Sequence, residues 1–137
     1  RCTSCGVTHV LLSALWLLRR ADAVVVIGAA LEGQATGKGH RPIAMASGRP
    51  VSTVRGWLRR FAARAEHARV EFTRLLHALD PVAPAVTPRG SPVADAVEAI
   101  GRAAAAVVVR LSPVGPWEFA SRASAGRLLA PPAGVGW

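Results

Sequence analysis

The chain has 137 residues, of which 51% are hydrophobic, and a formal net charge of +9. That length allows one compact domain, or a small domain with appendages, to bury a core. The longest apolar runs, residues 10–18 and 24–31, are shorter than the roughly 18 residues that a membrane-spanning helix needs. The first residues also lack the basic and then apolar regions of a signal peptide. We therefore expect a cytoplasmic protein without a membrane segment.

The positive charge is concentrated in one part of the chain. Residues 40–74 hold eight Arg against Glu66 and Glu71, whereas residues 1–39 and 75–137 carry net charges of only +2 and +1. The chain has 16 Arg and one Lys, a bias typical of high-GC coding sequences, but such a bias would spread Arg evenly. A local positive field favours an anionic partner such as nucleic acid.

The N-terminal segment carries a short strand pattern and two cysteines. Thr8–Leu12 is an apolar run with a β-branched start, which predicts a strand. Cys2 and Cys5 have the C-x-x-C spacing of a zinc-ligand pair, but two thiolates do not complete a tetrahedral site. His9 is better placed in the strand than as a third ligand. Bound zinc, free thiols and a disulfide all stay open.

The next segment predicts a helix from an Asp22 cap to about Gln34. Residues 36–39 (TGKG) interrupt it, and Pro42 fits the first turn of a second, short helix. Gly48 ends that helix, because glycine adopts positive φ without strain. The inward face of the first helix is expected to hold Val24, Ile27, Gly28 and Leu31.

A third helix is predicted from Pro50–Ser52 to about Arg64. Its apolar residues recur at i, i+3, i+4 and i+7, which places them on one buried face. Ala44 is small, so the second and third helices can approach closely around Gly48. These features predict a helix-turn-helix. The buried face is expected to hold Val54, Trp57, Leu58 and Phe61.

With that face inward, the opposite face of the third helix is cationic. A major groove admits such a helix, Arg can donate two hydrogen bonds to guanine, and hydroxyl and backbone N–H groups at a helix start suit phosphates. The alternative is a helical hairpin whose Arg-rich face is merely solvated. The candidate DNA-binding residues are Arg41, Arg49, Ser52, Thr53, Arg55, Gly56, Arg59 and Arg60.

The remaining chain predicts further helices. Glu66–Leu79 forms one, residues 81–91 form a Pro-rich linker, and Ser91 caps an Ala/Val-rich helix that runs to about Leu111. A short helix near 117–124 is expected to precede a fraying tail. The Ala/Val-rich helix packs either on the helix-turn-helix unit or on a second copy, which leaves a homodimer open.

The stretch GHRPIAMASGRPVSTVRGWLRRF (residues 39–61) resembles the helix-turn-helix of transposase-related and uncharacterised DNA-binding proteins of high-GC bacteria. In one such family a Cys-rich segment ending in C-x-x-C-G-x-T-H-x-L-L precedes it, and CTSCGVTHVLL at residues 2–12 is similar. The resemblance spans residues 1–80 and implies that Cys2 and Cys5 are half of a zinc ribbon. Ser47 departs from it, because the family usually has a large apolar residue there.

The expected fold is therefore mostly α: a three-helix, homeodomain-like bundle with a short N-terminal strand and additional C-terminal helices. The segments are a partial zinc ribbon (1–20), the helix-turn-helix domain (21–80), the linker (81–91) and a helical segment (92–137).

The predicted function is sequence-specific binding of double-stranded DNA, in a mobile-element-associated or regulatory protein. We expect no enzyme activity, because the three Asp and five Glu are scattered and predict no carboxylate site for two metal ions. Two alternatives remain. One is a non-catalytic protein-interaction module, and the other is a decayed partial reading frame.

Overall fold

The computed structural model describes residues 22–110 and 113–130. The predictions for Thr8–Leu12, Cys2 and Cys5 lie outside these residues. The regular secondary structure of the described part consists of six helices, which confirms the mostly helical class. They are α1 (Val24–Ala35), α2 (His40–Ser47), α3 (Val51–Ala62), α4 (Ala65–Leu79), α5 (Pro92–Arg110) and α6 (Pro116–Ala123).

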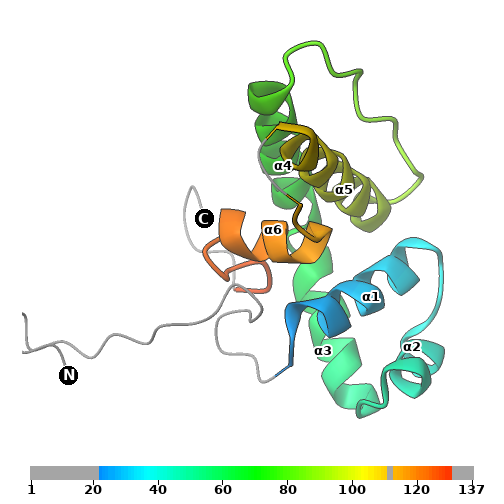
Figure 1. Ribbon diagram of the computed structural model, residues 1–137. Coiled ribbons are helices and arrows are strands. Elements are labelled where there is room, and N and C mark those ends of the chain that lie inside the picture. The colour runs from blue at the N-terminus through cyan, green and yellow to red at the C-terminus, as the bar shows by residue number, and fades with distance from the viewer. Residues whose placement is uncertain (1–21, 111–112, 131–137) are drawn as a thin grey trace, which may run out of the picture.

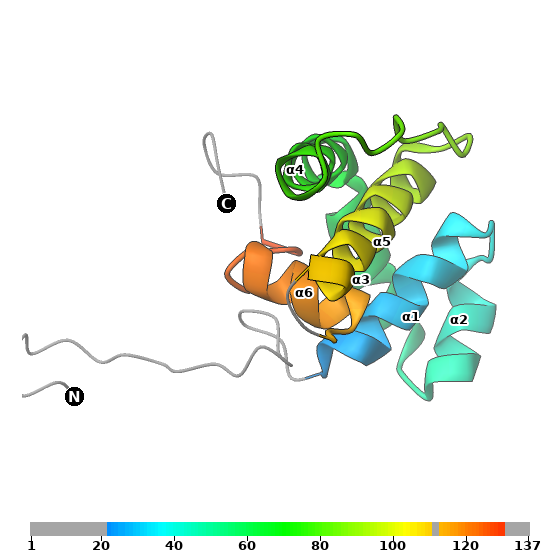
Figure 2. The ribbon, with the colours of Figure 1, turned by 45° about the horizontal axis from the view of Figure 1, so that its top comes forward.

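The helices gather in two groups that meet where α5 and α6 contact α1. Figure 1 shows α1, α2 and α3 at one end and α4 and α5 side by side at the other, with α6 between them. The turned view shows that α5 also passes along α1 (Figure 2). Within residues 22–110 and 113–130, no helix combines the length and the apolar character that crossing a bilayer requires.

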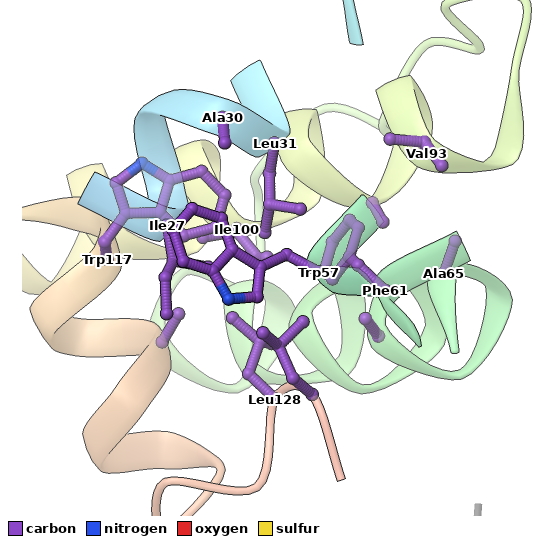
Figure 3. Packing of buried hydrophobic residues seen from close by; sticks show 14 of the residues in the cluster. Ile27, Ala30, Leu31, Trp57, Phe61, Ala65, Val93, Ile100, Trp117 and Leu128 are labelled. Atoms are coloured by element: carbon purple, nitrogen blue, oxygen red, sulfur yellow. The ribbon is translucent and has the colours of Figure 1, made fainter. Parts of the chain in front are cut away.

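One cluster of buried side chains draws on all six helices. The predicted stripe of α3 is confirmed, since Val54, Trp57, Leu58 and Phe61 are at most 6% exposed. Figure 3 shows Trp57 and Phe61 in the same interior as Leu31 of α1 and Leu128 near the C-terminus. The cluster includes residues on both sides of the Pro-rich segment 81–91, so α5 and α6 share a core with α1–α4.

Helix α6 is fixed to α1 by a close contact at Gly28. A Cβ at this position would lie only 2.2 Å from Cγ of Trp117, so the indole occupies the space that a side chain would fill. The Nε1–H of Trp117 donates a hydrogen bond to Oε1 of Glu32, one turn further along α1, at 2.7 Å. The predicted inward position of Gly28 is confirmed, and its role is to receive Trp117.

The predicted turn at Gly48 is confirmed. Gly48 has φ 63° and ψ 27°, in the left-handed region. The N–H of Arg49 donates to the carbonyl of Ala44 at 3.1 Å, and the N–H of Gly48 donates to that of Met45 at 3.3 Å. These bonds close the end of α2. Helix α3 begins three residues after Gly48, at Val51. The Ser47 hydroxyl donates to the Ala44 carbonyl at 3.2 Å, so it does not lack a partner.

The predicted Asp22 cap is wrong. The residue that caps α1 is Ala23, and no side chain accepts a hydrogen bond from the first turn. The carboxylate of Asp22 instead pairs with the guanidinium of Arg49, in the turn between α2 and α3. This ion pair ties the start of α1 to the turn between α2 and α3.

Two further boundaries differ from the prediction. Helix α3 ends at Ala62 rather than Arg64, because Arg64 leaves helical geometry at φ −117° and ψ 1° before α4 begins. The chain does not fray after α6 as far as residue 130. Leu128 and Leu129 are buried in the core, and turn hydrogen bonds such as Gly126 N–H to the Ser121 carbonyl hold the segment.

The segment 81–91 lacks helix, as predicted, but it is held against α5. The guanidinium of Arg102 donates to the carbonyls of Pro84 and Ala85 at 2.7 and 2.9 Å. Ser91 caps α5 as predicted, since its hydroxyl oxygen accepts from the N–H of Ala94 at 3.1 Å.

Candidate nucleic-acid interface

The solvent face of α3 carries the candidate residues. Ser52, Arg55, Arg59 and Arg60 are exposed, whereas Thr53 and Gly56 are half-buried. A Cβ at Gly56 would lie 3.0 Å from Nη1 of Arg60, so the Arg60 side chain folds back along the helix over Gly56. The buried stripe on the reverse side fixes the rotation of α3, and this face therefore has to point outward.

This face has no acidic counterpart nearby in sequence. Residues 40–62 contain five Arg and neither Asp nor Glu. Among the ion pairs formed within the described residues, none involves Arg41, Arg55, Arg59 or Arg60. Their charges are therefore exposed to solvent and add to one local positive field.

Arg49 is the exception among the candidates. Its Nε lies 2.6 Å from Oδ1 of Asp22, with side chains that are 44% and 17% exposed respectively. The pair neutralises the charge of Arg49 in part. A phosphate near this turn would have to compete with Asp22 for the guanidinium.

The N-terminal end of α3 also favours an anionic partner. Pro50 precedes the helix, no side chain caps it, and its first turn contains no acidic residue. The N–H groups of Val51, Ser52 and Thr53 lack carbonyl partners within the helix, as at every helix start. Together with the helix dipole they favour an anion at this end.

The two arginines of α4 form ion pairs with acidic residues of the same helix. On α4, Arg69 pairs with Glu66 and Arg74 with Glu71, each one turn apart. Hydrogen bonding from Arg69 lowers the pKa of the exposed Glu66 carboxyl, and the same bond raises the pKa of Arg69. The net charge of +6 over residues 40–74 thus divides into an unneutralised part on α2–α3 and a largely neutralised part on α4.

Arg64 was missed by reasoning from sequence. It is buried at the junction of α3 and α4, and its Nη1 donates to the carbonyl of Ala130 at 3.2 Å. Burial lowers the pKa of its guanidinium. The available signal was its spacing, because Arg64 follows Phe61 by three residues and so continues the buried stripe.

No group of three or more His, Cys, Asp or Glu side chains within residues 22–110 and 113–130 is arranged to hold a metal ion. Cys2 and Cys5 lie outside this part of the chain. The half zinc ribbon therefore stays a prediction from the sequence.

Comparison with models of protein families, with curated proteins and with solved structures gives no match to this chain. The resemblance to transposase-related proteins stays an expectation from the sequence.

Proposed function

We propose that this protein binds double-stranded DNA through a helix-turn-helix formed by α2 and α3, with α3 in the major groove. The observation that carries the proposal is the two-sided character of α3. One side is fully buried, and the other exposes Arg55, Arg59 and Arg60 without a single acidic residue between His40 and Ala62.

The positions of the side chains suggest separate roles. Arg55 and Arg59 are one turn apart on the outward face, where a helix in the groove presents side chains to base edges. Arg60 follows Arg59 on α3 and Arg41 lies at the start of α2; both side chains are exposed and suit phosphates. The N–H groups at the start of α3 and the Ser52 hydroxyl suit a phosphate at the groove edge.

The local structure supports binding by a preformed surface. The left-handed Gly48 and its closing hydrogen bonds fix the path from α2 to α3. Because Trp57 and Phe61 anchor α3 in the core, the backbone that carries the outward residues is held in place before binding. A preformed backbone of this kind limits the entropy lost on binding to the ordering of side chains. We further propose that binding prefers particular DNA sequences, and that the protein is mobile-element-associated or regulatory.

The experiment compares two double variants that remove the same charge. Fluorescence anisotropy with a random-sequence duplex measures the affinity over a range of salt concentrations. We expect the wild-type dissociation constant to rise with salt, with a log–log slope of about 0.9 for each phosphate neutralised. Arg55→Ala/Arg59→Ala should weaken binding roughly tenfold or more, because two cations leave the surface that meets the phosphates. Arg69→Ala/Arg74→Ala on α4 is the matched control and should change affinity less than threefold.

Two outcomes would contradict the proposal. Equal losses in the two double variants would mean that only the total positive charge matters. No binding of the wild type at low salt would favour the alternative of a protein-interaction module.

A further inference from the structure

The structure contains an apolar groove between α1 and α2 that the proposed DNA contacts do not use. Its volume is about 520 Å³, within the range of roughly 300–1,000 Å³ that is typical of small-molecule sites. The wall on α1 includes Val25 and Ala29, and the wall on α2 includes Pro42 and Ala46. These four side chains are all exposed, and Val25, a large apolar residue, is 52% exposed.

One charged residue lines this groove. Lys38 is the single lysine of the chain, in the loop between α1 and α2. Its N–H donates to the carbonyl of Gly33 at 2.9 Å, which fixes the loop at the end of α1. A Cβ at Gly33 would lie 3.8 Å from Cδ of Lys38, so the aliphatic stem of the lysine lies along the glycine.

The ammonium of Lys38 forms none of the ion pairs found in the part of the chain that the structure describes. The Ser47 hydroxyl, also at the groove, already donates to the Ala44 carbonyl. The groove thus combines apolar walls with a single cation whose charge is uncompensated.

We propose that the groove binds a small amphiphilic anion, with its apolar body between α1 and α2 and its carboxylate on Lys38. Apolar walls contribute affinity through the area removed from water. A single cation at one end selects a ligand that has one negative charge at one end of its body. Medium-chain carboxylates are the simplest ligands of this class. The proposal does not rest on DNA binding, because neither the ligand nor the walls involve α3.

The test uses decanoate and the uncharged decanol as probes, with isothermal titration calorimetry on the full chain. We expect decanoate to bind with one-to-one stoichiometry. Lys38→Met keeps the apolar stem and removes the charge, so it should weaken decanoate binding about tenfold while leaving decanol binding unchanged.

Filling the groove provides the second arm. Ala29→Phe from α1 and Ala46→Phe from α2 should each abolish binding of both probes, because each places a ring between the walls. Ala62→Phe, at an exposed position of α3 outside the groove, is the matched control and should leave binding unchanged. Both α1 and α2 are varied, so a folding defect in one variant leaves the other to decide. Circular dichroism checks their helix content.

The proposal would be overturned by the absence of saturable decanoate binding, or by binding that persists in both groove-filling variants. Decanoate binding that is equal in the wild type and in Lys38→Met would overturn the choice of an anion.

Discussion

At the scale of single residues, Gly28 shows how one position without a side chain sets the approach of two helices. The Trp117 ring lies where a Cβ would be, and its indole N–H is bonded to Glu32. Gly28→Ala should lower the free energy of unfolding by about 1–3 kcal/mol, because overpacking exceeds the gain in helix propensity. Urea denaturation measures this change.

Gly101 in α5 is the matched control for this substitution. A Cβ there meets nothing within 4 Å, so Gly101→Ala should raise the free energy of unfolding by about 0.5–1 kcal/mol. Equal effects of the two substitutions would show that Trp117 does not pack on Gly28 as described.

Asp22 is a second residue whose role is set by one contact. Its carboxylate holds Arg49 at the edge of the proposed DNA surface. Asp22→Asn removes a negative charge and releases the guanidinium, so we expect a several-fold gain in DNA affinity. The free energy of unfolding should change by less than about 1 kcal/mol, since the pair is partly exposed. Weaker DNA binding in the anisotropy assay would instead mean that Asp22 orients Arg49 for its contact.

At the scale of elements, the junction of α2 and α3 depends on the backbone of Gly48. The residue has positive φ, and a Cβ there would meet nothing within 4 Å, so a substitution is strained by conformation and not by crowding. Gly48→Ala should therefore lower the free energy of unfolding by about 1–2 kcal/mol.

Gly39→Ala is the matched control, because Gly39 also has open space but has φ −73°. Thermal melting should show a smaller drop in Tm for Gly39→Ala, which replaces the N-cap of α2, than for Gly48→Ala. A Gly48→Ala protein as stable as the wild type would argue against a left-handed turn at this position.

The elements also show what could be predicted from the sequence. Local signals were sufficient to predict the turn at Gly48, the Ser91 cap and the buried face of α3. That face consists of Val54, Trp57, Leu58 and Phe61. Contacts between distant segments were not accessible, because no local pattern shows that Trp117 meets Gly28 or that Leu128 is buried. Asp22 failed as a cap for the same reason, since its partner Arg49 belongs to another element. The outward direction of Arg55 and Arg59 was predictable, but their DNA contacts stay a prediction.

At the scale of the whole molecule, the core predicts one cooperative unit. Residues from α1–α4 and from α5, α6 and the following turn share one buried cluster. Thermal unfolding should therefore give a single transition by circular dichroism and by Trp fluorescence. Two separate transitions would support an independent 21–80 domain, and the absence of a cooperative transition would support a decayed reading frame.

The segment after α6 should contribute to this unit. Leu128 is fully buried, and Arg64 bonds to the carbonyl of Ala130 two residues later. Leu128→Ala should lower the free energy of unfolding by about 2–5 kcal/mol, as for other buried leucines. Val82 is 88% exposed, so Val82→Ala is the matched control and should have little effect in urea denaturation.

Helix α3 is the element that we propose meets DNA. Titration of the isotope-labelled protein with a short duplex, followed by amide chemical shifts in NMR, measures this contact residue by residue. We expect the largest shifts from Arg49 to Arg60 and at the start of α2, with α4 and α5 nearly unchanged. Shifts centred on α4 or α5, or none at a saturating duplex concentration, would contradict the account.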